Sequence, residues 1–196
     1  NISIYNFRFL LGKILGKRIK DNNIDVDFII PTPETSRVYA YGISYETKIP
    51  IQECIIKNRY VNRTFIIENK DMITENIKRK FSVINEIVAG KNVLLIDDSV
   101  VRGNTSREVI RLLKDGNVAD VYFASASPKI YNNNEYGIYI RTKEELITYK
   151  NNTDEKIAES IGCKKIIYNT LNDTLGLIND MNNSVNDMEV SMFLNS

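Results

Sequence analysis

The sequence predicts an α/β protein with a mostly parallel sheet flanked by helices. Short apolar runs, which are candidate strands, alternate along the chain with stretches whose apolar positions repeat like one face of a helix. The run Val-Leu-Leu-Ile at 93–96 is apolar at every position, as is typical of a strand buried on both faces. The 196 residues suffice for one well-buried domain.

The first part of the chain contains two helix patterns and two strand patterns. Apolar residues from Ile4 to Ile19 follow a helical period, and the Pro-x-Pro of 31–33 ends a short apolar run. We expect helices over 4–20 and 36–47, the second capped by Thr35 or Ser36, strands over 28–30 and 49–56, and a long loop over 57–75. A loop of this length is usually a functional lid or disordered.

The second part of the chain continues the alternation. We expect strands over 93–96, 118–126, 138–140 and 165–168, and helices over 105–114, 143–149, 154–161 and 172–179. The segment 180–188 is rich in Asn and Asp and is expected to be a loop.

Composition excludes several classes of function. The formal net charge of +1 argues against a nucleic-acid partner, because it provides no positive field for a phosphate backbone. The apolar runs stay far below the ~20 residues of a spanning helix, and the N-terminus lacks the pattern of a signal peptide. We therefore expect a soluble cytoplasmic protein with no membrane partner. Because the first residue is Asn1, we also expect a processed chain or one domain of a longer protein.

The residue types that are missing also limit the chemistry. The sequence has no histidine, which excludes Ser-His and Cys-His catalysis and imidazole metal sites. Cys54 and Cys163 lie in apolar surroundings and are expected to be buried small hydrophobes. What remains is carboxylates, hydroxyls, backbone amides, Lys, Arg and a hard metal ion, a set that favours phosphate handling.

A cluster of polar residues follows the most apolar run and precedes a predicted helix. Asp97 and Asp98 come first, and adjacent carboxylates suit sugar hydroxyls or a hard cation such as Mg²⁺. Gly103 allows the backbone to approach an anion, and the helix N-terminus that follows favours phosphate. The spacing leaves two alternatives open, a capping box formed by Thr105 and Glu108 and a solvated turn.

Two further segments have similar chemistry. The segment 30–36, IPTPETS, ends a strand in a rigid turn and delivers Thr35 and Ser36 to a helix N-terminus, which suits a diphosphate. Simple helix capping by the same hydroxyls is an equal alternative. The segment 57–66, KNRYVNRTFI, carries three cations and a tyrosine that could fold over a polyanion and exclude water, or form a solvated basic loop.

These three segments resemble the signatures of one enzyme family. The segment 93–106, VLLIDDSVVRGNTS, resembles the site for phosphoribosyl pyrophosphate (PRPP) of type I phosphoribosyltransferases, and IPTPETS resembles their pyrophosphate loop. The segment KNRYVNRTFI is similar to the flexible loop of amidophosphoribosyltransferases in particular. The chain departs from the family pattern at Asn62, Asn104, Tyr139 and Arg141.

The resemblance implies a fold and a set of site residues. It implies a type I phosphoribosyltransferase fold over 1–196, with a leading helix at 1–20, a flexible active-site loop and basic stretch at 57–80, and a C-terminal tail at 180–196. It implies catalytic roles for Lys57, Arg59 and Tyr60. The implied PRPP-binding residues are Thr35, Ser36, Lys80, Asp97, Asp98, Ser99, Arg102, Gly103, Asn104, Thr105 and Ser106. Thr35, Asp97 and Asp98 are the implied ligands of one Mg²⁺ per subunit, with no iron–sulfur cluster.

The resemblance also implies a reaction. Ammonia would be transferred to C1 of PRPP, giving 5-phosphoribosylamine and pyrophosphate in the first step of purine (IMP) synthesis. The family's N-terminal glutaminase domain is absent from this sequence, so free ammonia or a separate glutaminase chain is the expected partner, and a homo-oligomer is expected. One alternative is an inactive PRPP-binding regulatory module. A salvage transferase acting on a nucleobase is a further alternative, which the KNRYVNRTFI segment disfavours.

Overall fold

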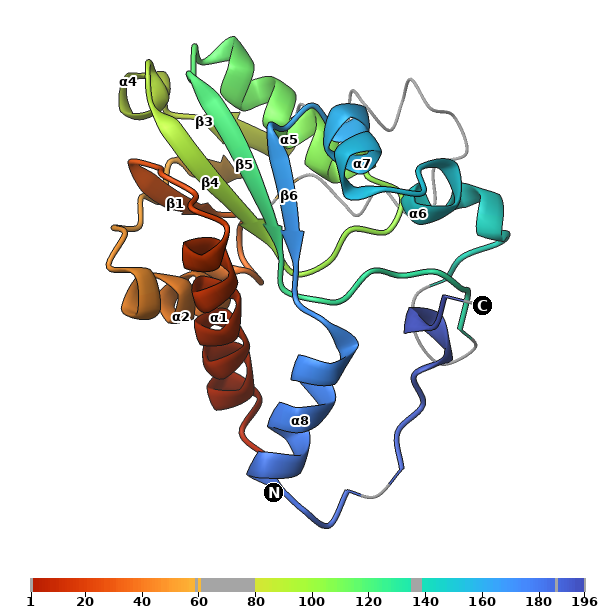
Figure 1. The fold of residues 1–196 in the computed structure, drawn as a ribbon. Helices are drawn as coiled ribbons and strands as arrows, with labels where there is room; N and C mark the ends of the chain where they lie inside the picture. The colour runs from red at the N-terminus through yellow and green to blue at the C-terminus, as the bar shows by residue number, and fades with distance from the viewer. Residues whose placement is uncertain (1, 59, 61–79, 135–138, 186, 196) are drawn as a thin grey trace.

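The computed structural model describes residues 2–58, 60, 80–134, 139–185 and 187–195. Its centre is a parallel sheet in the order β1-β4-β5-β6 (Figure 1). The strands are β1 (Phe28–Pro31), β4 (Asn92–Asp97), β5 (Asp120–Ser125) and β6 (Lys165–Tyr168). The predicted α/β class with a mostly parallel sheet is confirmed.

Helices cover both faces of this sheet (Figure 1). One layer consists of α1 (Ile4–Asp21) and α2 (Arg37–Thr47), with α8 (Leu171–Met181) beside α1, and the other of α5 (Asn104–Asp115) and α7 (Asp154–Ile161). Leu94 and Ile96 of β4 point into the core under α1 and α2, whereas Leu95 points into the core under α5 and α7. Burial on both faces explains why the run at 93–96 is apolar throughout.

A smaller antiparallel sheet lies apart from the main one. It consists of β2 (Ile55–Lys57) and β3 (Phe81–Val83), and the short helix α4 (Asn85–Val88) follows it. The strand predicted over 49–56 is therefore wrong in extent. Ile51 forms a single parallel bridge to Ile29 beside β1, and the chain then leaves the main sheet for the small one. An apolar run does not show which sheet its residues join. The predicted strand therefore included both the bridge of Ile51 to the main sheet and the start of β2 in the small sheet.

Other predicted elements are confirmed with small shifts at their ends. These are the helices over 4–20, 36–47, 105–114, 154–161 and 172–179, and the strands over 28–30, 93–96, 118–126 and 165–168. The loop predicted over 57–75 begins with the last residue of β2, and apart from residues 57, 58 and 60 it lies outside the described residues.

Two predictions near the C-terminus fail. Residue 138 of the strand predicted over 138–140 lies outside the described residues, and Tyr139 and Ile140 are not in a strand. The helix predicted over 143–149 is interrupted because Leu146 is extended, leaving the 3-10 helix η2 (Lys143–Glu145) and α6 (Ile147–Lys150). A further 3-10 helix, η3 (Ser191–Phe193), lies in the tail. Among the described helices, none is long and apolar enough to cross a membrane.

Candidate functional site

The carboxyl ends of β1 and β4 lie side by side and bring two of the predicted motifs together. Pro31 pairs with Ile96, and the Thr32 amide donates to the Ile96 carbonyl oxygen at 2.9 Å. The turn at 32–36 therefore lies against Asp97, the last residue of β4. The register of the sheet therefore brings the two candidate anion-binding segments into one site, although Ser36 and Asp97 are 61 residues apart in the sequence.

Asp97 is the buried centre of this site, with 8% of its surface exposed. Its Oδ1 accepts a hydrogen bond of 3.0 Å from the Ser36 hydroxyl and one of 2.9 Å from the Asp98 amide. Burial, together with the charge of Asp98, raises the pKa of Asp97 to about 7, while the charge of Lys80 acts in the opposite direction. A cation beside the two carboxylates would offset both the burial and the repulsion.

A divalent cation suits this pair of carboxylates. Asp98 is half-buried and Thr35 is exposed, so the predicted metal ligands combine one buried and two accessible side chains. In the part of the chain that the structure describes, no group of three or more Asp, Glu, Cys or His side chains could hold a metal alone. Mg²⁺ commonly binds through one or two carboxylates together with substrate phosphates, and the residues here fit that pattern.

Gly103 takes the cap position just before α5, and its φ of +77° lies in the left-handed region. The left-handed backbone favours glycine, and a Cβ at this position would lie 2.6 Å from Ile147 Cδ1 and 3.2 Å from Ile161 Cγ2, so a larger residue would require the Ile147 side chain to shift. Among the described residues no side chain caps this helix, and its first turn carries no acid. The first N–H groups of α5 are therefore available to an anion.

The capping box considered for Thr105 and Glu108 is wrong. Thr105 lies inside α5, because Gly103 takes the cap position and the helix starts at Asn104. The Glu108 carboxylate pairs instead with Arg111 at 2.6 Å. Thr105 therefore lies half-buried in the first turn of the helix and does not cap it.

Helix α2 also starts without a side-chain cap among the described residues. Ser36 takes the cap position as expected, but its hydroxyl donates to Asp97 instead of accepting from the helix. Arg37 forms an ion pair with Glu53 at 2.9 Å, and the peptide bond from Pro33 to Glu34 is cis. The simple capping alternative for this turn is thus not what the structure contains.

Two basic residues of the predicted lid and basic stretch, Lys57 and Lys80, lie at one end of the small sheet. Lys57 ends β2 opposite Phe81 of β3, and the Asn58 amide donates to the Lys80 carbonyl oxygen at 2.7 Å. Lys57 and Lys80 are therefore neighbours across the ribbon. Tyr60 is 98% exposed, and Arg59 lies outside the described residues. The catalytic roles of Lys57, Arg59 and Tyr60 stay predictions.

The remaining predicted residues follow Asp98 in the turn that leads into α5. Ser99, Asn104 and Thr105 are half-buried, and Ser106 is buried at the start of the helix. Arg102 turns its guanidinium to Glu145, with Nε at 2.7 Å from Oε2. No role was predicted for Glu145, because nothing in the local sequence connects it to a residue 43 positions earlier.

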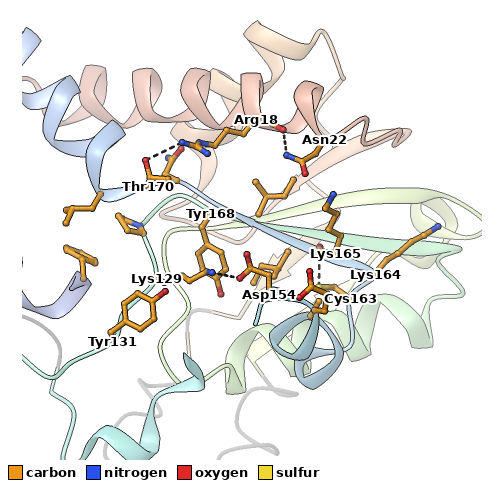
Figure 2. Close-up of a pocket in the computed structure, with 18 of the residues that line it drawn as sticks. Arg18, Asn22, Lys129, Tyr131, Asp154, Cys163, Lys164, Lys165, Tyr168 and Thr170 are labelled. Atoms are coloured by element: carbon orange, nitrogen blue, oxygen red, sulfur yellow. Dashed lines mark hydrogen bonds and ion pairs between the residues drawn. The ribbon is translucent and has the colours of Figure 1, made fainter. Parts of the chain in front are cut away.

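A cavity in the described structure lies away from these residues. It has a volume of about 850 Å³ and runs along β6, between the end of α1, α7 and the segment 128–131. Figure 2 shows that its walls are tied by ion pairs and hydrogen bonds, including Lys129 with Asp154 and Arg18 with Thr170. None of the predicted site residues lines this cavity.

The described residues form an α/β domain with a parallel sheet, and two carboxylates and two helix starts without a described side-chain cap lie at one edge of that sheet. The chain belongs to the phosphoribosyl transferase domain family, whose model matches residues 3–147. It is 41% identical over 178 residues to an amidophosphoribosyltransferase of Saccharomyces cerevisiae, and 37% identical over 194 residues to one of Escherichia coli. The matches cover 89% and 98% of the chain but only 34% and 38% of these relatives, so the chain spans little more than a third of their length.

Solved structures agree with this family. The glutamine PRPP amidotransferase from B. subtilis, complexed with ADP and GMP, matches 98% of the chain and 40% of its own, with a TM-score of 0.76 and 31% identity. A structure described as the allosteric regulatory enzyme of purine biosynthesis matches 90% of the chain and 37% of its own, with a TM-score of 0.75 and 32% identity. The type I phosphoribosyltransferase fold predicted from the motifs is thereby confirmed.

Proposed function

We propose that this domain binds PRPP and transfers ammonia to its C1, giving 5-phosphoribosylamine and pyrophosphate in purine biosynthesis. One observation carries the proposal: Asp97 and Asp98 lie between the starts of α2 and α5, and no described side chain caps either helix. A substrate with a phosphate at each end and a dihydroxylated sugar between them matches this order of groups. The similarity to amidophosphoribosyltransferases supports the same reaction.

Each part of the site has a proposed role. The 5′-phosphate lies at the start of α5, against the amides and hydroxyls of 103–106, and the diphosphate lies at the turn of Thr35 and Ser36. Asp97 and Asp98 face the ribose hydroxyls and, with Thr35, hold Mg²⁺. When bound, Mg²⁺ neutralises charge on the departing diphosphate.

The reaction requires no protein nucleophile. The C1–N bond forms as the C1–O bond breaks, the diphosphate leaves with the electron pair, and the new ammonium group loses a proton. Positive charge develops on the ribose ring, beside the carboxylates, and negative charge on the diphosphate, where Lys57, Arg59, Tyr60 and Lys80 are proposed to act. Catalysis is then positioning and electrostatic stabilisation, which explains how a chain without histidine performs it.

The proposed setting follows the family. The domain works in the cytoplasm as a homo-oligomer and takes ammonia directly or from a glutaminase domain or chain. Neither nucleic acid nor membrane is a proposed partner, since the net charge is only +1.

One assay tests the reaction. The chain is incubated with Mg²⁺, PRPP and ammonium at mildly alkaline pH, and pyrophosphate release is measured. Release that depends on ammonium supports the proposal. Tight PRPP binding without release would show a regulatory module instead, and release only on addition of adenine or guanine would show a salvage transferase.

A further inference from the structure

Residues 101–103 lead into α5, and each of them is held by the segment 139–147. The Ile147 amide donates to the Val101 carbonyl oxygen at 2.9 Å, and the Val101 side chain packs against the small core of Ile130, Ile140 and Leu146. Gly103 lies so close to Ile147 that its missing side chain would meet Ile147 Cδ1 at 2.6 Å. The segment therefore contacts this loop on both sides of Arg102.

Arg102 itself is fixed at several points. Its Nε and Nη2 both donate to Oε2 of Glu145, and Nη2 also donates to the Tyr139 carbonyl oxygen at 3.0 Å. The two side chains are 27% and 30% exposed, so the pair is partly shielded from water. A charged pair with several hydrogen bonds in such surroundings restricts the loop more than a fully exposed pair would.

The charges argue against Arg102 as a phosphate ligand. The guanidinium of Arg102 is already paired with the Glu145 carboxylate. Without this pairing, the negative charge of Glu145 would repel a phosphate dianion. As a pair, Arg102 and Glu145 present no net charge to the start of α5. The groups that face the proposed phosphate are then the amides of 103–106 and the hydroxyls of Thr105 and Ser106.

We propose that Glu145 is a positioning residue for the phosphate cradle: it clamps Arg102, and the clamp holds the left-handed turn at Gly103 so that the first amides of α5 face the phosphate. Arg102 acts through this clamp rather than by binding phosphate. The inference rests on the proposed PRPP site, but the clamp also exists without a ligand.

The decisive variant is Glu145→Gln, with PRPP affinity measured by titration calorimetry in the presence of Mg²⁺. If the clamp positions the cradle, the affinity falls about three- to tenfold, since a loosened turn no longer presents its amides together. If Arg102 binds phosphate directly, the same substitution frees the guanidinium, and affinity is unchanged or higher. Unchanged or tighter binding overturns the inference.

A second arm uses the pair as a unit. Under the clamp, the double variant Arg102→Gln/Glu145→Gln binds PRPP no more weakly than Arg102→Gln alone, and the exchanged pair Arg102→Glu/Glu145→Arg regains part of the lost affinity. If Arg102 binds the phosphate directly, moving its charge to position 145 does not restore PRPP affinity. An exchanged pair that binds PRPP as weakly as Arg102→Glu alone therefore counts against the clamp.

The chain contains a matched control. Arg18 donates through Nε and Nη2 to Oδ2 of Asp173, Nη2 also reaches Thr170 Oγ1 at 3.2 Å, and the exposures of the two charged side chains are 34% and 26%. This second clamp joins α1 to α8, away from the site. Asp173→Asn should lower the melting temperature without changing PRPP affinity. If Glu145→Gln and Asp173→Asn lose the same affinity, Glu145 contributes only to the general stability of the fold.

Hydrogen exchange separates the inference from the proposed function. In the unliganded chain, the amides of 103–106 should exchange faster in Glu145→Gln than in the parent, whereas in Asp173→Asn they should not. If the parent does not bind PRPP, the proposed function fails, and the exchange rates then decide the clamp. Unchanged exchange at 103–106 would overturn it.

Discussion

Helices α5 and α8 both start at the carboxyl edge of the parallel sheet, but their N-termini are completed in opposite ways. Thr170 accepts from the Asp173 amide, and the Asp173 carboxylate accepts from the Thr170 amide, so α8 is closed by its own capping box. No described side chain caps α5, which follows Gly103 and has no acid in its first turn. One helix start satisfies its own amides, and the other leaves them for a ligand.

The aspartates beside the two helix starts differ in the same way. Burial acts against ionisation of Asp173, but hydrogen bonds from Thr170 and Arg18 outweigh it and lower the pKa of this carboxyl. Burial and Asp98 raise the pKa of Asp97, which accepts only from Ser36 and a backbone amide among the described residues. The charge of Asp173 is balanced by Arg18 within the protein, whereas the charge of Asp97 is proposed to be balanced by bound Mg²⁺.

The largest expected effect comes from Asp98→Asn. The side chain is half-buried, so the fold should survive, but the site loses one of the two carboxylates that are proposed to face Mg²⁺ and the ribose. We expect pyrophosphate release to fall by about 100-fold or more, as for removal of one electrostatic group from an active site. The control Asp173→Asn should keep activity near that of the parent. An Asp98 variant within about threefold of the parent would remove Asp98 from the mechanism.

The second prediction tests why glycine precedes α5. Gly103→Ala meets left-handed strain of about 1–2 kcal/mol and crowding against Ile147 of about 1–3 kcal/mol. Gly90 has a similar φ of +70° with nothing within 4 Å of an added methyl group, so Gly90→Ala meets the strain alone. Urea denaturation should show a larger loss of unfolding free energy for Gly103→Ala than for Gly90→Ala. Only Gly103→Ala should bind PRPP more weakly than the parent. Equal losses in the two variants would mean that Ile147 moves aside without cost.

The third prediction uses the opposite pKa shifts of Asp97 and Asp173. Since the pKa of Asp97 lies near 7 in the fold against an ordinary 3.8, the folded chain binds a proton that the unfolded chain releases between these values. Stability should therefore fall as pH rises from about 4 to 7, by at most about 1.4 kcal/mol per pH unit, and level off above 7. The lowered pKa of Asp173 has the opposite effect: its contribution to stability is lost as the pH falls below the ordinary pKa of an aspartate.

Urea denaturation of the ligand-free chain between pH 5 and 8 measures the Asp97 contribution. Asp97→Asn should remove the slope, and Mg²⁺ with PRPP should stabilise the parent more at pH 8 than at pH 5. A slope that persists in Asp97→Asn would assign it to another group.

How far the sequence predicts this site depends on the sequence distance between the groups that form it. The turns after β1 and β4 were predictable because a strand, a Pro or Gly turn and a helix start are consecutive in each. The cap of α5 was not, because Thr105 and Glu108 have the spacing of a capping box, whereas the structure places Gly103 at the cap and close to Ile147, which is 44 residues away in the sequence. The hydrogen bond from Ser36 to Asp97 likewise depends on the register of β1 and β4, which no local sequence pattern predicts.

The smallest expected effect comes from giving α5 an acid of the kind α8 already has. Asn104→Asp places a carboxylate in the first turn, where the helix dipole should stabilise α5 by about 0.3–1 kcal/mol. The same charge repels a bound phosphate, so PRPP affinity should fall about three- to tenfold, and less at high ionic strength because salt screens exposed charges. Thr170→Ala is the reverse change at α8: it should cost about 1 kcal/mol of stability and leave PRPP affinity unchanged. Tighter or equal binding by Asn104→Asp would mean that the phosphate does not lie at the start of α5, since no anion gains from an added negative charge at its own binding site.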